Sequence, residues 1–335
     1  MKTRDFDYDL PPELIAQTPI EPRDAAQLLQ LDRSSGALGH FHFYDLPGLL
    51  RPGDLLVANE SRVIPARIFA HKAETGGAVE ILLLRRLDEV TWQALLRSHR
   101  VHMGTQIEIR PGLVAEVIEL SASGERILRF NQPIDAHLNE LGVMPLPPYI
   151  HAPLHDPERY QTIYSHTLGS AAAPTAGLHF TPRLLEQLHA HDVHLIYVTL
   201  HVGLDTFKPV ETEDLEQHHI HTEYMELTEE AVTRIRLAKA AGRRVIAVGT
   251  TSVRVLETAG ERGLSAFRGD TRLFIYPGFP FRVVDGLITN FHLPKSSLLM
   301  LVAAFAGKEK IDRAYAEAIA RRYRFYSFGD AMLIL

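Results

Sequence analysis

A β-rich stretch in the first half of the chain constrains the fold more than any other feature. Between Val63 and Phe130 the sequence holds six short segments rich in β-branched residues and separated by Gly, Pro or charged turns: VIPARIFAHK, AVEILLLRR, TWQALLR, TQIEIR, LVAEVIEL and RILRF. No helical pattern lies among them, and strands at this spacing are typical of an antiparallel sheet or a small barrel. We therefore predict that residues 62–147 form an inserted antiparallel β-barrel domain.

The chain on either side of this insert follows a different pattern. Before it, 28–32 and 37–43 predict a hairpin, 43–50 a short helix and 53–59 a buried strand. After it, we predict helices at 182–191, 228–241, 252–262, 296–306 and 309–322, and strands at 193–200, 243–248, 272–276, 282–288 and 331–335. Alternating strands and helices indicate an α/β layer with a largely parallel sheet, formed by residues 1–61 and 148–335.

Composition excludes several classes of protein. The chain has 335 residues, of which 46% are hydrophobic and 23% charged, so it can form a buried hydrophobic core. No run approaches the roughly 18 apolar residues of a membrane span, and the N-terminal segment lacks the basic stretch and apolar core of a signal peptide. We expect a cytoplasmic, monomeric protein with no membrane partner.

Cysteine content and net charge narrow the chemistry further. The absence of cysteine excludes a thiol nucleophile, thiolate zinc sites and cysteine-ligated iron–sulfur clusters. A net charge of −6 argues against a general nucleic-acid binder, so any nucleic acid must be held by a local basic patch. We select as candidates five cations that fall in or next to the insert: Arg62, Arg67, Lys72, Arg97 and Arg100.

Two motifs with histidine follow likely strand or loop ends, where ligands gather in α/β sheets. The first, GSAAAPTAGLHFTP (169–182), is rich in small residues that let backbone approach a ligand, and it carries Thr175, Gly177 and His179. A tight crossover with a buried histidine is the alternative. The second, VTLHVGLDTFKPV (198–210), places His201 at the end of a predicted strand.

Two further motifs combine a strand end with a helix start. In VIAVGTTSVRVLE (245–257), the amides of Gly249–Ser252 could bind an anion, with Arg254 as a charged fork. Helix capping by Thr251 or Ser252 is the alternative, and neither a dinucleotide nor a P-loop motif is present. In LITNFHLPKSSLLMLV (287–302), helix capping explains Pro294 and Ser296 but not the side chains Asn290 and His292.

The segment EQHHIHTEY invites a metal interpretation through His218, His221 and Glu223. The His-x-x-His spacing is short, and no third cluster completes a standard site. We predict no metal. An acid–base or substrate-binding role for Glu223 is one interpretation, and a purely structural role is the alternative.

The amino-acid sequences of several segments resemble those of a known family. The segments are APTAGLHF (173–180), VTLHVG (198–203), VIAVGTTSVR (245–254), FIYPGF (274–279), TNFHLPKSSLLMLVAAFAG (289–307), YRFYSFGDAM (323–332), GDLLVANESRVIPAR (53–67), GGAVEILLLR (76–85) and MPLPPYI (144–150). They resemble, in order and across nearly the whole chain, the signature segments of the S-adenosylmethionine:tRNA ribosyltransferase-isomerase family of queuosine biosynthesis.

This resemblance implies a barrel-like α/β domain carrying an inserted antiparallel β-barrel. It implies transfer and isomerisation of the ribosyl moiety of S-adenosylmethionine onto 7-aminomethyl-7-deazaguanine at the wobble position of tRNA, giving epoxyqueuosine-tRNA, adenine and methionine. S-adenosylmethionine and the precursor-bearing tRNA are then the partners. S-adenosylmethionine is a substrate, and no separate cofactor is implied.

The resemblance also suggests roles for the motif residues. We expect His179 and His201 near the reacting ribose, with His292 or Glu223 as further catalytic candidates. Substrate binding would involve Thr175, Gly177, Gly249, Thr250, Thr251, Ser252, Arg254 and Asn290. Binding of tRNA would involve Arg62, Arg67, Lys72, Arg97 and Arg100.

The chain departs from the family pattern at three places: Leu204 and Asp205 after HVG, Asn59–Arg62, and Ser98–His102. In the last of these segments, relatives usually carry Lys. At Asp205, where the family usually has Gly, we expect a left-handed backbone.

Two rival functions stay open. One is a different S-adenosylmethionine-dependent or nucleoside transferase that acts without tRNA. The other is a non-catalytic RNA-binding protein that uses the barrel. A binder has no need for histidines at the strand ends of the other domain, and release of adenine only when tRNA is present would separate all three.

Overall fold

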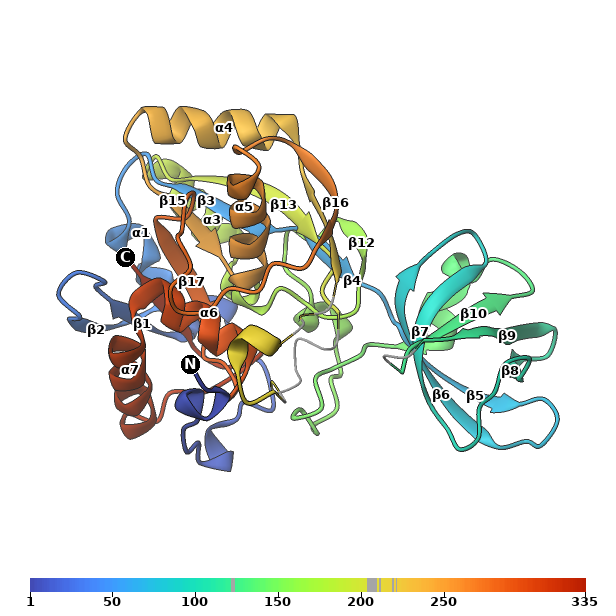
Figure 1. Cartoon of the computed structure of the whole chain (residues 1–335). Coiled ribbons are helices and arrows are strands. Elements are labelled where there is room, and N and C mark those ends of the chain that lie inside the picture. The colour runs from blue at the N-terminus through green and yellow to red at the C-terminus, as the bar shows by residue number, and fades with distance from the viewer. Residues whose placement is uncertain (122–123, 204–209, 211, 219, 221) are drawn as a thin grey trace. The chain divides into compact units, whose positions relative to one another are not determined.

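A computed structural model describes the whole chain except residues 122–123, 204–209, 211, 219 and 221 (Figure 1). The chain forms two compact units. The larger comprises Met1–Ser61, Pro147–Thr167 and Ala173–Leu335, and the smaller comprises Arg62–Leu146 and Leu168–Ala172. The segment 168–172, which the sequence pattern assigned to the larger domain, thus belongs to the smaller unit.

The larger unit contains a nine-stranded sheet with the order β16-β14-β13-β3-β15-β17-β18-β1-β2. Its strands are β1 (Gln27–Leu31), β2 (Leu38–His42), β3 (Leu55–Asn59), β13 (His194–Leu200), β14 (Glu223–Leu227), β15 (Val245–Val248), β16 (Phe267–Thr271), β17 (Gly286–Asn290) and β18 (Ala331–Ile334). The central neighbours β13, β3, β15 and β17 are parallel. The pairings β13–β14, β14–β16, β17–β18 and β1–β2 are antiparallel, so the sheet is mixed and not largely parallel as expected.

Helices cover both faces of this sheet (Figure 1). They are α1 (Leu46–Leu49), α3 (Pro182–Ala190), α4 (Glu229–Ala240), α5 (Thr250–Glu261), α6 (Ser297–Ala306) and α7 (Lys308–Ala320). Leu184 and Leu188 of α3 share one buried core with Leu56 and Ala58 of β3. Because side chains alternate along a strand, the neighbouring residues of β3 point to the opposite face, where α4 and α5 pack. All five residues of β3 are therefore buried.

Local signals set where these helices begin. Thr181, Thr228 and Ser296 precede α3, α4 and α6, and each side chain accepts a hydrogen bond from a backbone amide in the first turn. Such caps satisfy amides that the helix itself leaves unpaired. The five long helices predicted from the sequence are confirmed to within two residues at each end.

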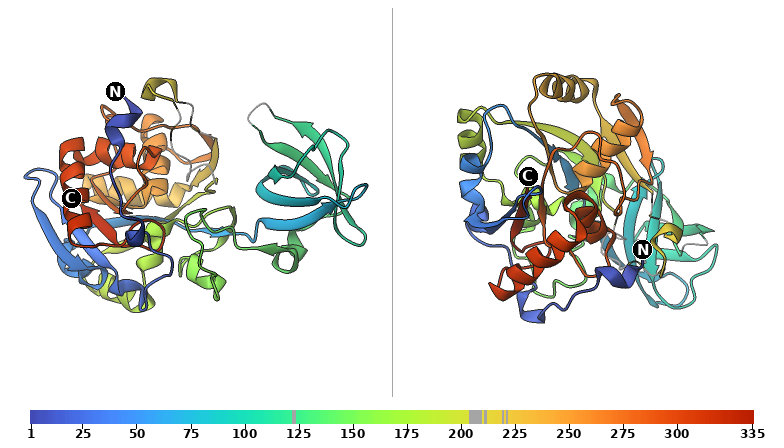
Figure 2. Two further views of the ribbon diagram at one scale, coloured as in Figure 1. Left: turned by 90° about the horizontal axis from the view of Figure 1, so that it is seen from below. Right: turned by 60° about the vertical axis from the view of Figure 1, so that its left-hand side comes forward.

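The smaller unit is a closed antiparallel barrel (Figures 1 and 2). Its strands are β5 (Arg67–Lys72), β6 (Ala78–Arg86), β7 (Thr91–Arg97), β8 (Gln106–Arg110), β9 (Leu113–Leu120) and β10 (Arg126–Phe130), and β5 pairs with β8 to close it. Helix α2 (Leu138–Leu141) and β11 (Gly142–Val143) complete the unit, while β4 (Ser61–Val63) and β12 (Thr167–Ser170) form a short ribbon. Alternate residues such as Ile68, Ile81, Trp92 and Ile107 fill the interior.

The predicted fold class is confirmed: an α/β unit carries a small antiparallel barrel. One predicted strand is wrong, because residues 272–276 are irregular and the strand β16 lies at Phe267–Thr271. In the part of the chain that the structure describes, no helix is both long and apolar enough to cross a membrane.

Candidate active site

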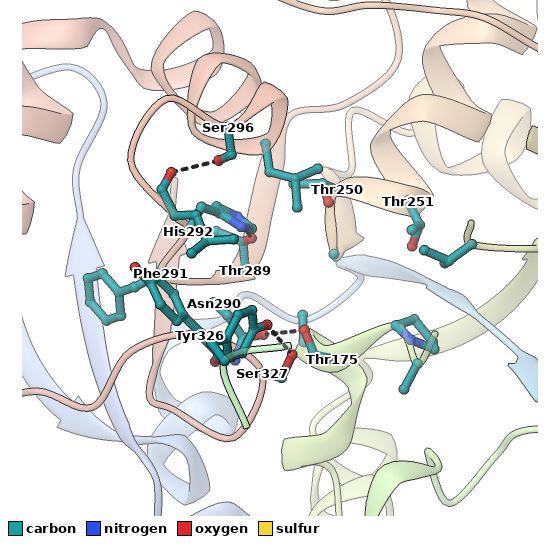
Figure 3. A pocket seen from close by; sticks show the side chains of 18 residues that line it. Thr175, Thr250, Thr251, Thr289, Asn290, Phe291, His292, Ser296, Tyr326 and Ser327 are labelled. Atoms are coloured by element: carbon teal, nitrogen blue, oxygen red, sulfur yellow. Dashed lines mark hydrogen bonds between the residues drawn. The ribbon is translucent and has the colours of Figure 1, made fainter. Parts of the chain in front are cut away.

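A pocket lies in the larger unit where β15 and β17 end (Figure 3). These two strands are parallel, so their carboxyl ends meet at one edge of the sheet, the usual place for a ligand in an α/β fold. The pocket opens to solvent, and its free space, counted together with the solvent at its mouth, is about 620 Å³. Its walls come from the segments Ala173–Ala176, Gly249–Thr251, Thr289–Leu293 and Tyr326–Ser327, with Tyr149, Val202, Ser296 and Leu298.

The N-terminus of α5 forms one wall of this pocket. Gly249 is the N-cap, with φ of +86°, and no side chain caps the helix. The alternative that Thr251 or Ser252 caps α5 is therefore wrong. Ser252 is fully buried and its hydroxyl donates to the carbonyl oxygen of Val248, away from the pocket. The amides of Thr250 and Thr251 are thus left at the pocket wall, where the helix dipole favours a negative group.

Thr251 adds an unused polar atom to the same wall. Its hydroxyl is shielded from solvent and has no hydrogen-bond partner among the residues that the structure describes. A buried hydroxyl without a partner costs free energy. Thr251 is therefore suited to hydrogen-bond a ligand in the pocket.

Asn290 is held in one orientation by three partners. Its Oδ1 accepts from the Thr175 hydroxyl at 3.3 Å, and its Nδ2 donates to the carbonyl oxygen of Tyr326 at 3.1 Å (Figure 3). The same Nδ2 lies 3.3 Å from Nε2 of His179. Because Nδ2 is the donor, Nε2 of His179 must be the acceptor and its ring proton must lie on Nδ1.

His179 itself lies behind Asn290 and does not line the pocket. It is buried and its ring packs against Phe43, with 4.9 Å between ring centres. Burial lowers the pKa of His179 to about 4, so the ring is neutral at pH 7 and fixes the Asn290 amide from behind.

His292 lines the pocket directly (Figure 3). Its Nε2 is 2.7 Å from the hydroxyl of Thr289, and its backbone amide donates to the Tyr315 hydroxyl at 2.8 Å. The hydroxyl of Tyr8 donates to the His292 carbonyl oxygen at 2.5 Å. Burial lowers the pKa of His292 to about 3, so this imidazole is also neutral at pH 7.

An aromatic pair from two distant segments lines the pocket, and neither residue was among the predicted site residues. The rings of Tyr149 and Tyr326 lie 4.8 Å apart, and the Tyr149 hydroxyl is 2.7 Å from that of Ser327. Tyr326 has φ of +71°, an uncommon conformation for a non-glycine residue. The signal was present, since both tyrosines lie in segments that resemble the family, MPLPPYI and YRFYSFGDAM.

Glu223 and Arg254, predicted as a catalytic and a substrate-binding residue, form a buried ion pair with each other. Glu223 Oε1 also accepts the amide of Gly203 at 3.0 Å, and Arg254 Nε donates to the carbonyl oxygen of Leu273 at 3.1 Å. Neither side chain lines the pocket. Burial lowers the pKa of Arg254 to about 10. The structure thus places Glu223 and Arg254 next to each other, but it places neither side chain in the pocket.

His201 and Gly177 also lie outside the pocket lining. The His201 ring stacks on Tyr224, with 5.6 Å between ring centres, and burial lowers its pKa. A side chain at Gly177 would meet the Tyr164 hydroxyl at 2.2 Å, so packing explains that glycine. The predictions for Asp205 and for His221 lie outside the described residues. The described residues contain no group of three His, Cys, Asp or Glu side chains placed to hold a metal.

Four of the five cations predicted to bind tRNA fall into two groups in the barrel. Arg67 pairs with Glu80 at 3.2 Å, and Arg97 lies opposite Glu80 on the next strand. Lys72 and Arg100 line one hollow at the end of the barrel where β5 meets β8. Arg62 lies on β4.

The sequence matches a known family over almost its whole length. The family described as "Queuosine biosynthesis protein" matches residues 3–334. S-adenosylmethionine:tRNA ribosyltransferase-isomerases from Symbiobacterium thermophilum and Carboxydothermus hydrogenoformans are 53% and 54% identical to it, with 100% of this chain and of each relative covered.

A solved structure gives the same result. The crystal structure of an S-adenosylmethionine tRNA ribosyltransferase from Thermotoga maritima is 43% identical and aligns with a TM-score of 0.58, covering 99% of this chain and 100% of that one. Full-length matches at this identity, together with the barrel inserted in an α/β unit, show that the chain belongs to the queuosine biosynthesis protein family.

Proposed function

We propose that this chain is an S-adenosylmethionine:tRNA ribosyltransferase-isomerase. It transfers and isomerises the ribosyl moiety of S-adenosylmethionine onto 7-aminomethyl-7-deazaguanine at the wobble position of tRNA, and it releases adenine and methionine. The observation that carries this proposal is the full-length match to relatives of that name. The pocket at the ends of β15 and β17 supports it with a set of groups suited to a nucleoside.

The pocket offers different groups to different parts of S-adenosylmethionine. The uncapped amides of α5 and the Thr251 hydroxyl suit an oxygen-rich group, such as the methionine carboxylate or the ribose hydroxyls. The Tyr149–Tyr326 pair offers an aromatic wall for adenine. The fixed amide of Asn290 and the imidazole of His292 would then face the ribose.

The reaction requires proton transfer next to the sulfonium, which acidifies the adjoining ribose carbon. Of the four predicted catalytic residues, His179, His201, His292 and Glu223, we assign this role to His292, because it is the one that lines the pocket. His179 acts through Asn290, which it holds in place. Glu223 and Arg254 support the framework around α5, and His201 lies next to the pocket residue Val202.

S-adenosylmethionine is consumed as a substrate in this reaction, and we propose that no separate cofactor takes part. The tRNA would contact the barrel cations Arg62, Arg67, Lys72, Arg97 and Arg100. The location in the cytoplasm and the monomeric state are part of the same proposal.

One assay tests the function. The protein is incubated with S-adenosylmethionine and tRNA carrying the precursor base, and adenine and methionine are separated by chromatography. We expect both products with this tRNA and none without it. Release without tRNA would indicate a different S-adenosylmethionine-dependent transferase, and tRNA binding without release would indicate an RNA-binding protein.

A further inference from the structure

A second hollow lies in the barrel and shares no lining residue with the pocket described above. It opens to solvent, and its free space together with the solvent at its mouth is about 1180 Å³. Its lining residues are Lys72, Glu74, Thr75, His99, Arg100, His102, Thr105 and Gln106. Two loops form it: the β5–β6 connection and the β7–β8 connection. Closure of the barrel through β5 and β8 brings these loops together, and the amide of Ala73 donates to the carbonyl oxygen of Gln106 at 3.0 Å.

The chemistry of the lining points to an anion. Every lining side chain is polar, and the charged groups are the cations Lys72 and Arg100 against the single carboxylate of Glu74. Imidazole, hydroxyl and amide groups add hydrogen-bond donors. The lining has no aliphatic, Phe, Tyr or Trp side chain, so it offers no apolar wall for a lipid tail. An oxygen-rich anion such as a phosphate group does not need one.

The loop that carries these donors is held in an unusual conformation. Arg100 has φ of +52°, in the left-handed region that non-glycine residues rarely adopt. The Lys72 ammonium donates to the carbonyl oxygens of His99 and Arg100 and so holds the loop from inside. At the loop ends, the Ser98 hydroxyl donates to the Ala78 carbonyl oxygen at 2.8 Å and the His102 amide donates to the Thr105 hydroxyl at 3.0 Å.

These contacts divide the cations by role. The ammonium of Lys72 is engaged with backbone oxygens, so it positions the loop. Among the described residues, the guanidinium of Arg100 has no hydrogen-bond or ion-pair partner, and the side chain is exposed, so its five N–H donors are available to a ligand. The net charge of −6 means that attraction of a polyanion has to come from a local cluster of this kind.

We propose that this hollow binds a backbone phosphate of the acceptor tRNA, with Arg100, His99 and His102 as contacts and Lys72 as a positioning residue. This inference rests on the proposed function, because it takes tRNA as the ligand. It gives the barrel a defined role, which is to hold the RNA backbone at one point through the β7–β8 loop.

Binding of precursor-bearing tRNA to the full-length protein, measured by filter retention at several salt concentrations, tests the proposal. We expect Arg100→Gln to raise the Kd about three- to tenfold and to reduce the slope of log Kd against log salt by about 0.7–0.9, the effect of one lost phosphate contact. Arg129→Gln is the matched control, since Arg129 is an exposed barrel cation that pairs with Glu116 at 3.2 Å. It should change the Kd less than about twofold.

Two further variants test the positioning role of Lys72. Lys72→Met should weaken tRNA binding about as much as Arg100→Gln, because the loop loses its anchor. Lys72→Arg keeps donors that can reach both carbonyl oxygens and should restore most of the affinity. Thermal unfolding and S-adenosylmethionine affinity should stay at the parent values in all four variants.

The outcomes separate this inference from the proposed function. Equal Kd and equal salt slope for parent, Arg100→Gln and Arg129→Gln would overturn the phosphate site, even if the parent releases adenine with tRNA. Binding of inorganic phosphate that Arg100→Gln abolishes, with an unchanged tRNA Kd, would show a free-phosphate site and would also overturn the proposal. Failure of the parent to release adenine would reject the proposed function. The Kd values and salt slopes would still decide whether the hollow binds a tRNA phosphate.

Discussion

The buried pair Glu223–Arg254 gives the sharpest test of whether the structure or the motif pattern assigns roles correctly. The pattern made Glu223 a catalytic candidate, but the structure encloses it with Arg254 outside the pocket. Glu223→Gln isolates the charge. A glutamine Oε1 can still accept the Gly203 amide, which now lies 3.0 Å from Oε1 of Glu223, but its amide nitrogen would face the guanidinium, donor against donor.

The size of the effect follows from the burial of Arg254. Burial lowers the pKa of Arg254 to about 10, because removal from water penalises the charged guanidinium. Breaking a buried ion pair by removing one partner costs about 3–5 kcal/mol in general. We therefore expect Glu223→Gln to lower the free energy of unfolding of the larger unit by about 3–5 kcal/mol. The double variant Glu223→Gln, Arg254→Met should recover most of this loss.

The two units provide an internal control for the measurement. The single tryptophan, Trp92, is buried in the barrel core, so its fluorescence reports the smaller unit. Circular dichroism at 222 nm reports α3–α7, which lie in the larger unit. In a urea titration, Glu223→Gln should shift the dichroism transition to lower urea and leave the fluorescence transition in place.

Turnover completes this test. Per folded molecule, Glu223→Gln should keep turnover within about tenfold of the parent, whereas loss of a general acid–base group costs about 10²–10⁴-fold. Unchanged unfolding together with a loss of turnover above about a hundredfold would refute the structural reading and make Glu223 catalytic.

Three further outcomes are expected. In an adenine-release assay, His292→Gln should lower turnover about a hundredfold or more. His201→Phe keeps a ring that can stack on Tyr224 and should lower turnover less than about tenfold. The reverse order would contradict the assignment of His292 as the acid–base residue. Gly177→Ala should cost about 1–3 kcal/mol by overpacking against Tyr164, and adding Tyr164→Phe should recover part of it in urea unfolding; no loss at all would show that the site can relax. Burial holds the pKa of His179 at about 4, below the unfolded value near 6.5, so the unfolded state takes up the proton first and stability falls as pH drops below 6.5. Between pH 6.5 and 5, His179 should contribute about 2 kcal/mol of this fall, and His179→Phe should lose that much less than the parent; equal losses would mean that His179 does not titrate as the structure requires.

Local patterns predicted those parts of the fold that local forces determine. The barrel strands were found because residues such as Ile68 and Ala70 alternate with exposed neighbours. The strand expected at 272–276 is wrong because its apolar residues suggested a strand, whereas β16 is the less apolar FRGDT at Phe267–Thr271, selected by its pairing with Glu223–Leu227. Pairing between distant segments is not visible in either segment alone.

The same distinction explains what was predicted of the site. Gly249, Asn290 and His292 were found because they follow strands that end at one edge of the sheet. Tyr149 and Tyr326 were not, because they come from irregular segments that only the folded chain brings together. The sequence shows that Glu223 and Arg254 are charged, but it does not show that the two side chains pair with each other in the fold.

If S-adenosylmethionine reacts in the pocket at the ends of β15 and β17, a crystal of the protein soaked with S-adenosylmethionine should show it bound there. We expect density for the ribose between the N-terminus of α5 and the side chains of Asn290 and His292, with adenine against Tyr149 and Tyr326. Clear density for the ligand at any other place, with this pocket empty, would contradict the account.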